Sequence, residues 1–133
     1  MDLTITTESF GMSDHSWLGS AHGVDSARSV TLDIAKIDSD FVASGYAPSG
    51  LPLGVVTATG LYGQYDGDAS DGRQTLVGFL VEAVKAVTGH KASGAILEHG
   101  VVKADRLPAE IDANGVADVA GRIIVHNFVG GGS

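Results

Sequence analysis

The side chains that could bind a metal or move a proton are few and scattered. The chain has five histidines: His15, His22, His90, His99 and His126. A zinc site in a short chain usually has ligands close in sequence, such as two histidines one helical turn apart, and no such pair occurs here. Acidic neighbours precede His15 and His99, but adjacent residues on a strand point to opposite faces. The histidines are therefore interpreted as surface or edge residues, and we predict no metal site.

A second candidate for chemistry is the aspartate-rich loop of residues 66–72. Oxygen-bearing side chains occupy alternate positions, as calcium prefers, and they are Asp66, Asp68 and Ser70. The pattern then fails, because Asp71 stands where a calcium loop needs its sharp-turn glycine and Val77 replaces the bidentate glutamate. Aspartate and glycine are also the ordinary residues of turns. We predict a connector rather than a calcium site.

Recognised catalytic and cofactor motifs are missing from the sequence. It has no G-x-S-x-G elbow, dinucleotide fingerprint or phosphate loop, and Asp38 and Asp40 flank nothing that indicates a cleft. With no cysteine, thiol chemistry and disulfides are also excluded. We predict a protein that is not an enzyme and has no cofactor. The alternative is a small β-barrel ligand- or metal-binding module, or a hydrolase, that uses His99, Glu98 and the loop from Asp66 to Asp71.

The size and charge of the chain restrict its partners. At 133 residues it fits one domain. The formal charge of -8 disfavours nucleic acid and anionic membranes, and no apolar run approaches the roughly 20 residues that span a bilayer. The acidic start, MDLTITTESFG, predicts no export signal. Charged residues make up 18%, so either part of the surface faces other protein or a small β domain spends much of its length on turns.

Residue patterns predict a mainly β domain. Alternating apolar residues indicate strands near 29–35, 53–59, 93–103 and 122–126. Residues 75–87 fit both a helix and a strand, and Gly78 favours the strand. Residues 36–40 and 48–52 are predicted as turns, 60–74 as a loop, and 109–120 as a helix that Asn114 and Gly115 shorten. The expected fold class is β-rich α+β: a compact β-barrel or β-tulip-like domain with one short helix and an extended N-terminal arm.

The first 28 residues lack the periodicity of the rest. Lone large apolar residues stand among small polar ones, which predicts an arm that becomes ordered on a partner. The only tryptophan, Trp17, is either an interface anchor or a residue that folds back onto its own domain. We therefore divide the chain into an arm (1–28), a β-rich domain (29–128) and a glycine-rich tail (129–133).

In this order, the segments resemble a known family. The stretch SWLGSAHGVDSARSVTLD is similar to its arm and first strand, and GYAPSGLPLG, TATGLYGQYD and ASDGRQTLVGFL are similar to its middle. Residues 96–102, Leu107-Pro108, a short helix and Ala120 to Ile124 are similar to its end. Over about residues 14–126, the chain resembles the lambda-type head decoration proteins of tailed phages, in the actinobacterial-phage branch. The helix of this chain is less regular than that family leads one to expect.

The resemblance implies a structural virion protein. Such proteins are homotrimers on the outer surface of the expanded capsid, at threefold and quasi-threefold sites, where they stabilise the shell against DNA pressure. The implied partners are the major capsid protein and other copies of the chain, without nucleic acid or membrane. The residues expected to bind the capsid are Ser16, Trp17, Leu18, Gly19, His22 and Val24. Truncation of residues 1–24 is expected to leave a folded protein that no longer decorates capsids, and the loop 63–72 is expected to point outward.

Overall fold

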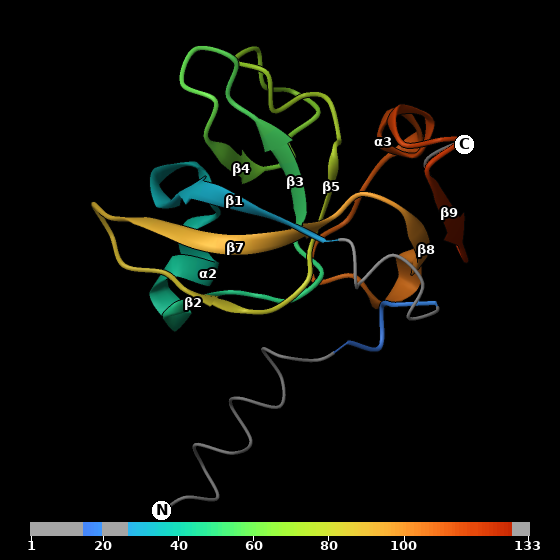
Figure 1. The fold of residues 1–133 in the computed structure, drawn as a ribbon, viewed down its shortest axis with the longest axis horizontal. Coiled ribbons are helices and arrows are strands. Elements are labelled where there is room, and N and C mark those ends of the chain that lie inside the picture. Colours follow the sequence, from blue (N-terminus) through green and yellow to red (C-terminus); the bar gives the residue numbers. More distant parts are fainter. Residues whose placement is uncertain (1–14, 20–26, 129–133) are drawn as a thin grey trace, which may run out of the picture.

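The computed structural model describes residues 15–19 and 27–128, and these residues form a strand-rich domain (Figure 1). The elements in chain order are β1 (Arg28–Asp33), η2 (Ile34–Lys36), α2 (Ser39–Ser44), β2 (Tyr46–Ala47), β3 (Pro52–Val55), β4 (Tyr62–Gln64), β5 (Gly78–Leu80), β6 (Val84–Lys85), β7 (Lys91–Leu97), β8 (Gly100–Lys103), η3 (Ala104–Arg106), α3 (Ala113–Asp118) and β9 (Ile123–His126). The predicted mainly β fold class is confirmed. In the described part of the chain, no helix has the length and apolarity needed to cross a membrane.

Five of the strands close into a barrel. Their order is β1-β4-β3-β5-β7, and β7 returns to pair with β1 along an antiparallel ladder. The β1–β4 contact is parallel, and the other contacts in the barrel are antiparallel. In β1 the predicted alternation is present, because Val30 and Leu32 are buried while their neighbours Ser29 and Thr31 are exposed.

Two hydrophobic cores lie on opposite sides of β5 and β7. We call them the barrel core, which lies inside the barrel, and the end core. The barrel core consists of Val30, Leu32, Ile34, Ile37, Ala47, Leu51, Leu53, Leu80, Ala86 and Ile96. The end core consists of Trp17, Tyr65, Leu76, Phe79, Val81, Leu97, Val102, Ile111, Val119 and Ile123. Successive residues of β5, and Ile96 and Leu97 at the end of β7, alternate between the two cores, so the sheet is buried on both faces at this point.

The end core is covered by a second, smaller sheet. Strands β8 and β9 are parallel, in a register of four residue pairs, and η3 and α3 lie in the connection between them. Figure 1 shows β8, β9 and α3 together on one side of the barrel. Strand β9 was predicted from its run of apolar residues, and it spans four of those five positions.

The predicted turn at 36–40 is wrong in part, because α2 begins there. Asp38 caps the helix by accepting a hydrogen bond from the amide of Asp40 at 2.9 Å. Gly45 ends it in the left-handed conformation, with φ of 96°. The helix has only six residues and buries none of them, so it has no apolar stripe that the sequence could reveal. The described residues thus hold two short α-helices, α2 and α3, where one was predicted.

Several other boundaries differ from the prediction. The expected strand 93–103 is interrupted by a turn, and Gly100, with φ of 134°, begins a separate strand. The strand expected at 53–59 ends at Val55, and the loop 60–74 contains β4. The helix expected at 109–120 is reduced to α3. Residues 75–87 form β5 and β6, so the preference for strand over helix is correct.

Candidate interaction surface

The short segment 15–19 is attached to the body of the domain through Trp17. Its indole is fully buried and lies 6.0 Å, between ring centroids, from Phe79 of β5. The indole Nε1 donates to Ser49 Oγ at 2.9 Å, and this hydroxyl donates to the carbonyl of Val81 at 2.6 Å. A buried indole N–H needs such an acceptor. Of the two interpretations that the sequence left open, the structure shows the one in which Trp17 folds onto its own domain.

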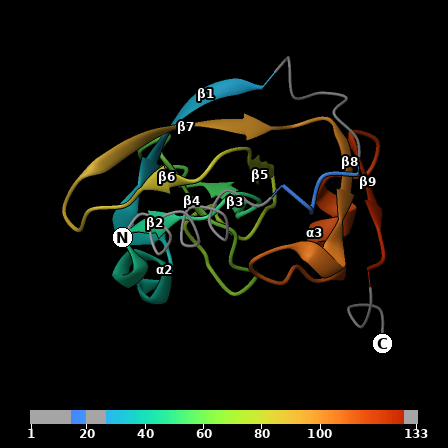
Figure 2. The same cartoon turned by 90° about the horizontal axis from the view of Figure 1, so that it is seen from below.

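The same segment also extends the small sheet by main-chain bonds. Leu18 forms an antiparallel bridge with Val102 of β8. The amide of Gly19 donates to the carbonyl of Val101 at 2.8 Å, and the amide of Lys103 donates to the carbonyl of Trp17 at 2.7 Å. Residues 17–19 therefore occupy one edge of β8 while β9 occupies the other (Figure 2).

The turn at Pro48-Ser49-Gly50 shapes the site that receives Trp17. Gly50 has φ of 88°, and a Cβ at this position would lie 2.8 Å from Cδ1 of the indole. Only glycine combines this backbone conformation with so close an approach. The sequence predicted the turn but not its role, because a turn signal does not indicate which distant side chain packs on it.

One polar contact completes the attachment of the segment. His15 Nε2 lies 3.1 Å from Glu82 Oε2, and both side chains are partly exposed. Because this contact is partly open to solvent, it adds little to the buried indole and the two main-chain bonds.

The predicted arm residues differ in how far their side chains are buried. Trp17 is buried, Ser16 and Leu18 are half-buried, and Gly19 is exposed. His22 and Val24 lie outside the described residues. Truncation of residues 1–24 would remove the largest side chain of the end core, so we now expect it to lower the stability of the domain as well.

The residues of the alternative catalytic or metal site have structural partners. Glu98 pairs with Arg28 at 2.7 Å, and the same guanidinium donates to Tyr62 Oη at 2.9 Å. The hydrogen bonds from Arg28 hold the pKa of Glu98 below its usual range. His99 is exposed after β7. The Glu98 carboxylate is therefore engaged by Arg28, and no hydrogen bond between it and His99 is found among the described residues.

The aspartates of the loop 66–72 bond to their own backbone. Asp66 Oδ1 accepts from the amide of Asp68 at 3.0 Å, as in an Asx turn. Asp71 accepts from the amide and from Nε of Arg73, and the backbone hydrogen bond from Arg73 is the main cause of its lowered pKa. Within residues 15–19 and 27–128, no three histidine, aspartate or glutamate side chains lie together as a metal site.

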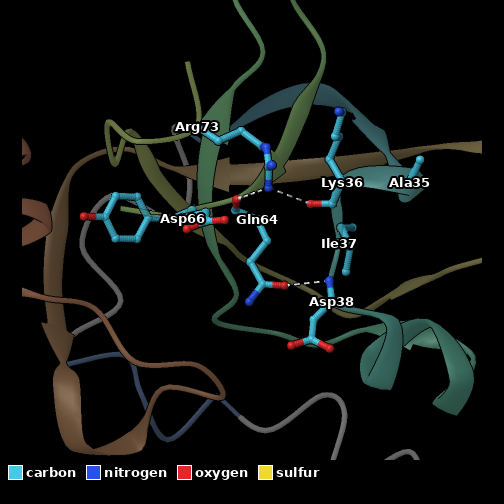
Figure 3. Close-up of a pocket in the computed structure, with 8 residues that line it drawn as sticks. Ala35, Lys36, Ile37, Asp38, Gln64, Asp66 and Arg73 are labelled. Carbon is cyan, nitrogen blue, oxygen red and sulfur yellow. Dashed lines mark hydrogen bonds between the residues drawn. The ribbon is translucent and has the colours of Figure 1, made fainter. Parts of the chain in front are cut away.

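A polar hollow of about 400 Å³ lies beside this loop (Figure 3). Arg73 points into it and donates from Nη1 to the carbonyls of Gln64 and Lys36, at 3.2 and 3.5 Å. The Gln64 side chain in turn accepts from the amide of Asp38 at 2.9 Å. These hydrogen bonds hold β4 against the residues that follow η2.

The fold and its buried contacts thus define a structural or binding domain, in which paired polar groups support packing. Comparison with protein families then identifies the chain: the family model described as bacteriophage lambda head decoration protein D matches residues 21–122. Because this match covers more than half of the chain, the protein belongs to that family. It is therefore a structural component of a phage head, of a family that decorates the capsid and is not enzymatic. No curated protein matches the chain.

Proposed function

We propose that the protein is a trimeric cement protein of the phage head. Three copies bind the outer surface of the expanded capsid at threefold and quasi-threefold sites, contact the major capsid protein and stabilise the shell against DNA pressure. Each contact between an arm and the capsid can be weak, because linking three of them in one trimer raises the overall affinity through effective concentration. A ligand that binds only the mature lattice stabilises it by mass action.

The observation that supports this proposal most directly is the attachment of residues 15–19. The bonds to β8 and the buried indole fix the position of His15 on the domain. Any contact made by the preceding residues is therefore linked to a rigid body, which is what a clamp between capsid subunits requires. Fourteen residues precede this point, enough to span roughly 45 Å when extended.

The capsid-binding residues predicted from the sequence divide between two tasks in this proposal. Trp17 and Leu18 hold the base of the arm to the domain. Ser16 and Gly19, with His22 and Val24, stay as predicted capsid contacts together with residues 1–14. An extended arm can bind by adding a strand to an open sheet edge of the capsid protein, because its main-chain groups complete that edge.

The test is a pair of truncations mixed with undecorated expanded capsids of the phage. Deletion of residues 1–14 should leave the domain folded and abolish decoration, as seen by circular dichroism and electron cryo-microscopy. Deletion of residues 1–19 should also lower stability, because it removes Trp17. Density for three copies at the threefold positions is expected with the full chain. Full occupancy by the shorter chain that lacks residues 1–14, or monomers at other lattice positions, would overturn the proposal.

A further inference from the structure

The outer edge of β9 has unused main-chain groups. In the β8–β9 ladder the amide of Gly100 donates to the carbonyl of Arg122 at 3.1 Å. The main-chain N–H and C=O groups of successive strand residues point to opposite sides. The main-chain groups of Arg122 and Ile124 therefore face β8, while those of Ile123 and Val125 face away from it. The amide of Ile123 donates to Val119 at 3.0 Å. The carbonyl of Ile123 and both main-chain groups of Val125 therefore point to the open side, where no described strand pairs with β9.

The side chains around this edge are apolar or basic. Ile124 is 60% exposed and borders a hollow of about 310 Å³ on the β8–β9 surface. Residues 99–103 and 121–126 contain Lys103, Arg122 and two histidines but no carboxylate, in a chain whose net charge is -8. Arg122 donates to the carbonyls of Val77 and Glu98, and the Glu98 carboxylate near it is paired with Arg28. The nearby Asp105 accepts from the side chain of Asn127 at 3.1 Å. The edge thus suits an extended segment that is acidic and partly apolar.

We propose that this edge binds residues 2–8 of the same chain as an added strand in the free protein. Their sequence, DLTITTE, alternates Leu3 and Ile5 with threonines, and β-branched residues of this kind favour strands. Residues 1–14 carry three carboxylates and neither lysine nor arginine. Their charge is therefore opposite to that of the β9 edge, and the apolar side chains can cover Ile124. Such an added strand also protects an edge that would otherwise be open to aggregation.

The length of the chain before Trp17 makes this contact reachable within one molecule. Residues 17–19 run antiparallel to β8, and the amide of Leu18 donates to the carbonyl of His15 at 2.9 Å, so the chain turns at His15, two residues before Trp17. A strand outside β9 lies three strand spacings from residues 17–19, or roughly 14 Å. Residues 9–14 can span roughly 20 Å when extended, and Gly11 allows a reversal.

Hydrogen–deuterium exchange on the free full-length protein tests the proposal. Alternate amides within residues 3–7, and the amide of Val125, should exchange roughly tenfold more slowly than in an unstructured chain, which cross-strand pairing can supply. Ile124→Asp should abolish this protection, because it adds a negative charge beside an acidic strand. The matched control is Val87→Asp, at a residue that is 44% exposed and lies away from β9, and it should leave the protection unchanged. Unprotected amides at residues 3–7 in the unmodified protein, or equal effects of the two variants, would overturn the proposal.

Cross-linking then determines which chain supplies the strand. Because the protein has no cysteine, Ile5→Cys combined with Ile124→Cys introduces the only two thiols. Mild oxidation should give a cross-linked monomer, several-fold faster than Ile5→Cys combined with Val87→Cys. Cross-linked dimers from a mixture of the two single variants, without monomer closure in the double variant, would overturn the intramolecular assignment. Both tests use the free protein, so their outcome is separate from that of capsid decoration.

Discussion

The two hydrophobic cores differ in how much of the chain each one requires. The barrel core takes its members from residues between Val30 and Ile96, and the strands around it close on themselves. The end core combines Trp17, near the start of the chain, with residues as late as Ile123. The barrel core can therefore be completed by residues 30–96 alone. The end core is incomplete until the segment that carries Trp17, from outside the barrel, has packed against it. The region that depends on this segment is also the one from which the arm begins.

The largest expected effect comes from Trp17→Ala, which should lower the free energy of unfolding by about 3–5 kcal/mol. The substitution removes a fully buried indole and leaves Ser49 without its donor. Urea denaturation measures the loss, and hydrogen exchange locates it. The amide of Lys103, which bonds to the carbonyl of Trp17, should lose protection while the β1–β7 ladder retains it.

Leu32→Ala is the matched change in the barrel core, with an expected cost of about 2–5 kcal/mol. It should raise exchange along β1 and β7. If the two variants expose the same amides, the cores unfold as one unit and the distinction between them fails.

An intermediate effect is expected from Gly50→Ala, with Gly45→Ala as its control. Both glycines have positive φ, 88° and 96°, so alanine at either position should cost about 1–2 kcal/mol in backbone strain. At Gly50 the new Cβ also overlaps Trp17, whereas nothing lies within 4 Å at Gly45. Gly50→Ala should therefore lose about 1–3 kcal/mol more in thermal or urea unfolding. Equal losses would show that the site around Trp17 can expand.

The smallest effect is expected from Tyr65→Phe. Tyr65 follows strand β4, and its hydroxyl binds Asp112, the N-terminal cap of α3. The phenol donates to Asp112 Oδ1 at 2.6 Å, and its loss should cost about 1 kcal/mol at neutral pH because Asp112 is exposed. Tyr46→Phe, at an exposed tyrosine, should stay within about 0.5 kcal/mol of the unmodified protein.

The same contact predicts a pH dependence. The hydrogen bond from Tyr65, followed by that from the amide of Gly115, lowers the pKa of Asp112 in the folded protein. Its contribution is therefore complete above the unfolded-state pKa of about 3.9 and is lost as the pH falls through the lower, folded value. Urea midpoints at pH 7 and pH 3 should differ less in Tyr65→Phe than in the unmodified protein. An identical difference would contradict the assignment of the pKa shift to Tyr65.

Much of the barrel could be predicted because its signals are local. Val30 and Leu32 alternate with polar residues, and such a pattern specifies a half-buried strand without knowledge of its partners. The short elements could not be predicted in the same way. Helix α2 depends on a cap at Asp38 and a stop at Gly45, with no buried residue between them.

The site around Trp17 could be predicted only as one of two alternatives. Its members are Ser49, Gly50, Phe79 and Val81, which come from separate parts of the chain. No pattern in residues 15–19 indicates which of them packs on the indole. Gly115 is a similar case: it interrupts the predicted helix, and the structure places it where a Cβ would lie 3.3 Å from the ring of Tyr65.

The bridge between Leu18 and Val102 also limits the order in which parts of the fold can form during synthesis. Its two residues are 84 positions apart, so the early segment emerges long before the strand that will hold it. Closing so long a loop has an entropic cost that only late contacts can offset. During synthesis, the segment around Trp17 therefore stays without its partner strand until β8 has left the exit tunnel, and the barrel has the opportunity to form first.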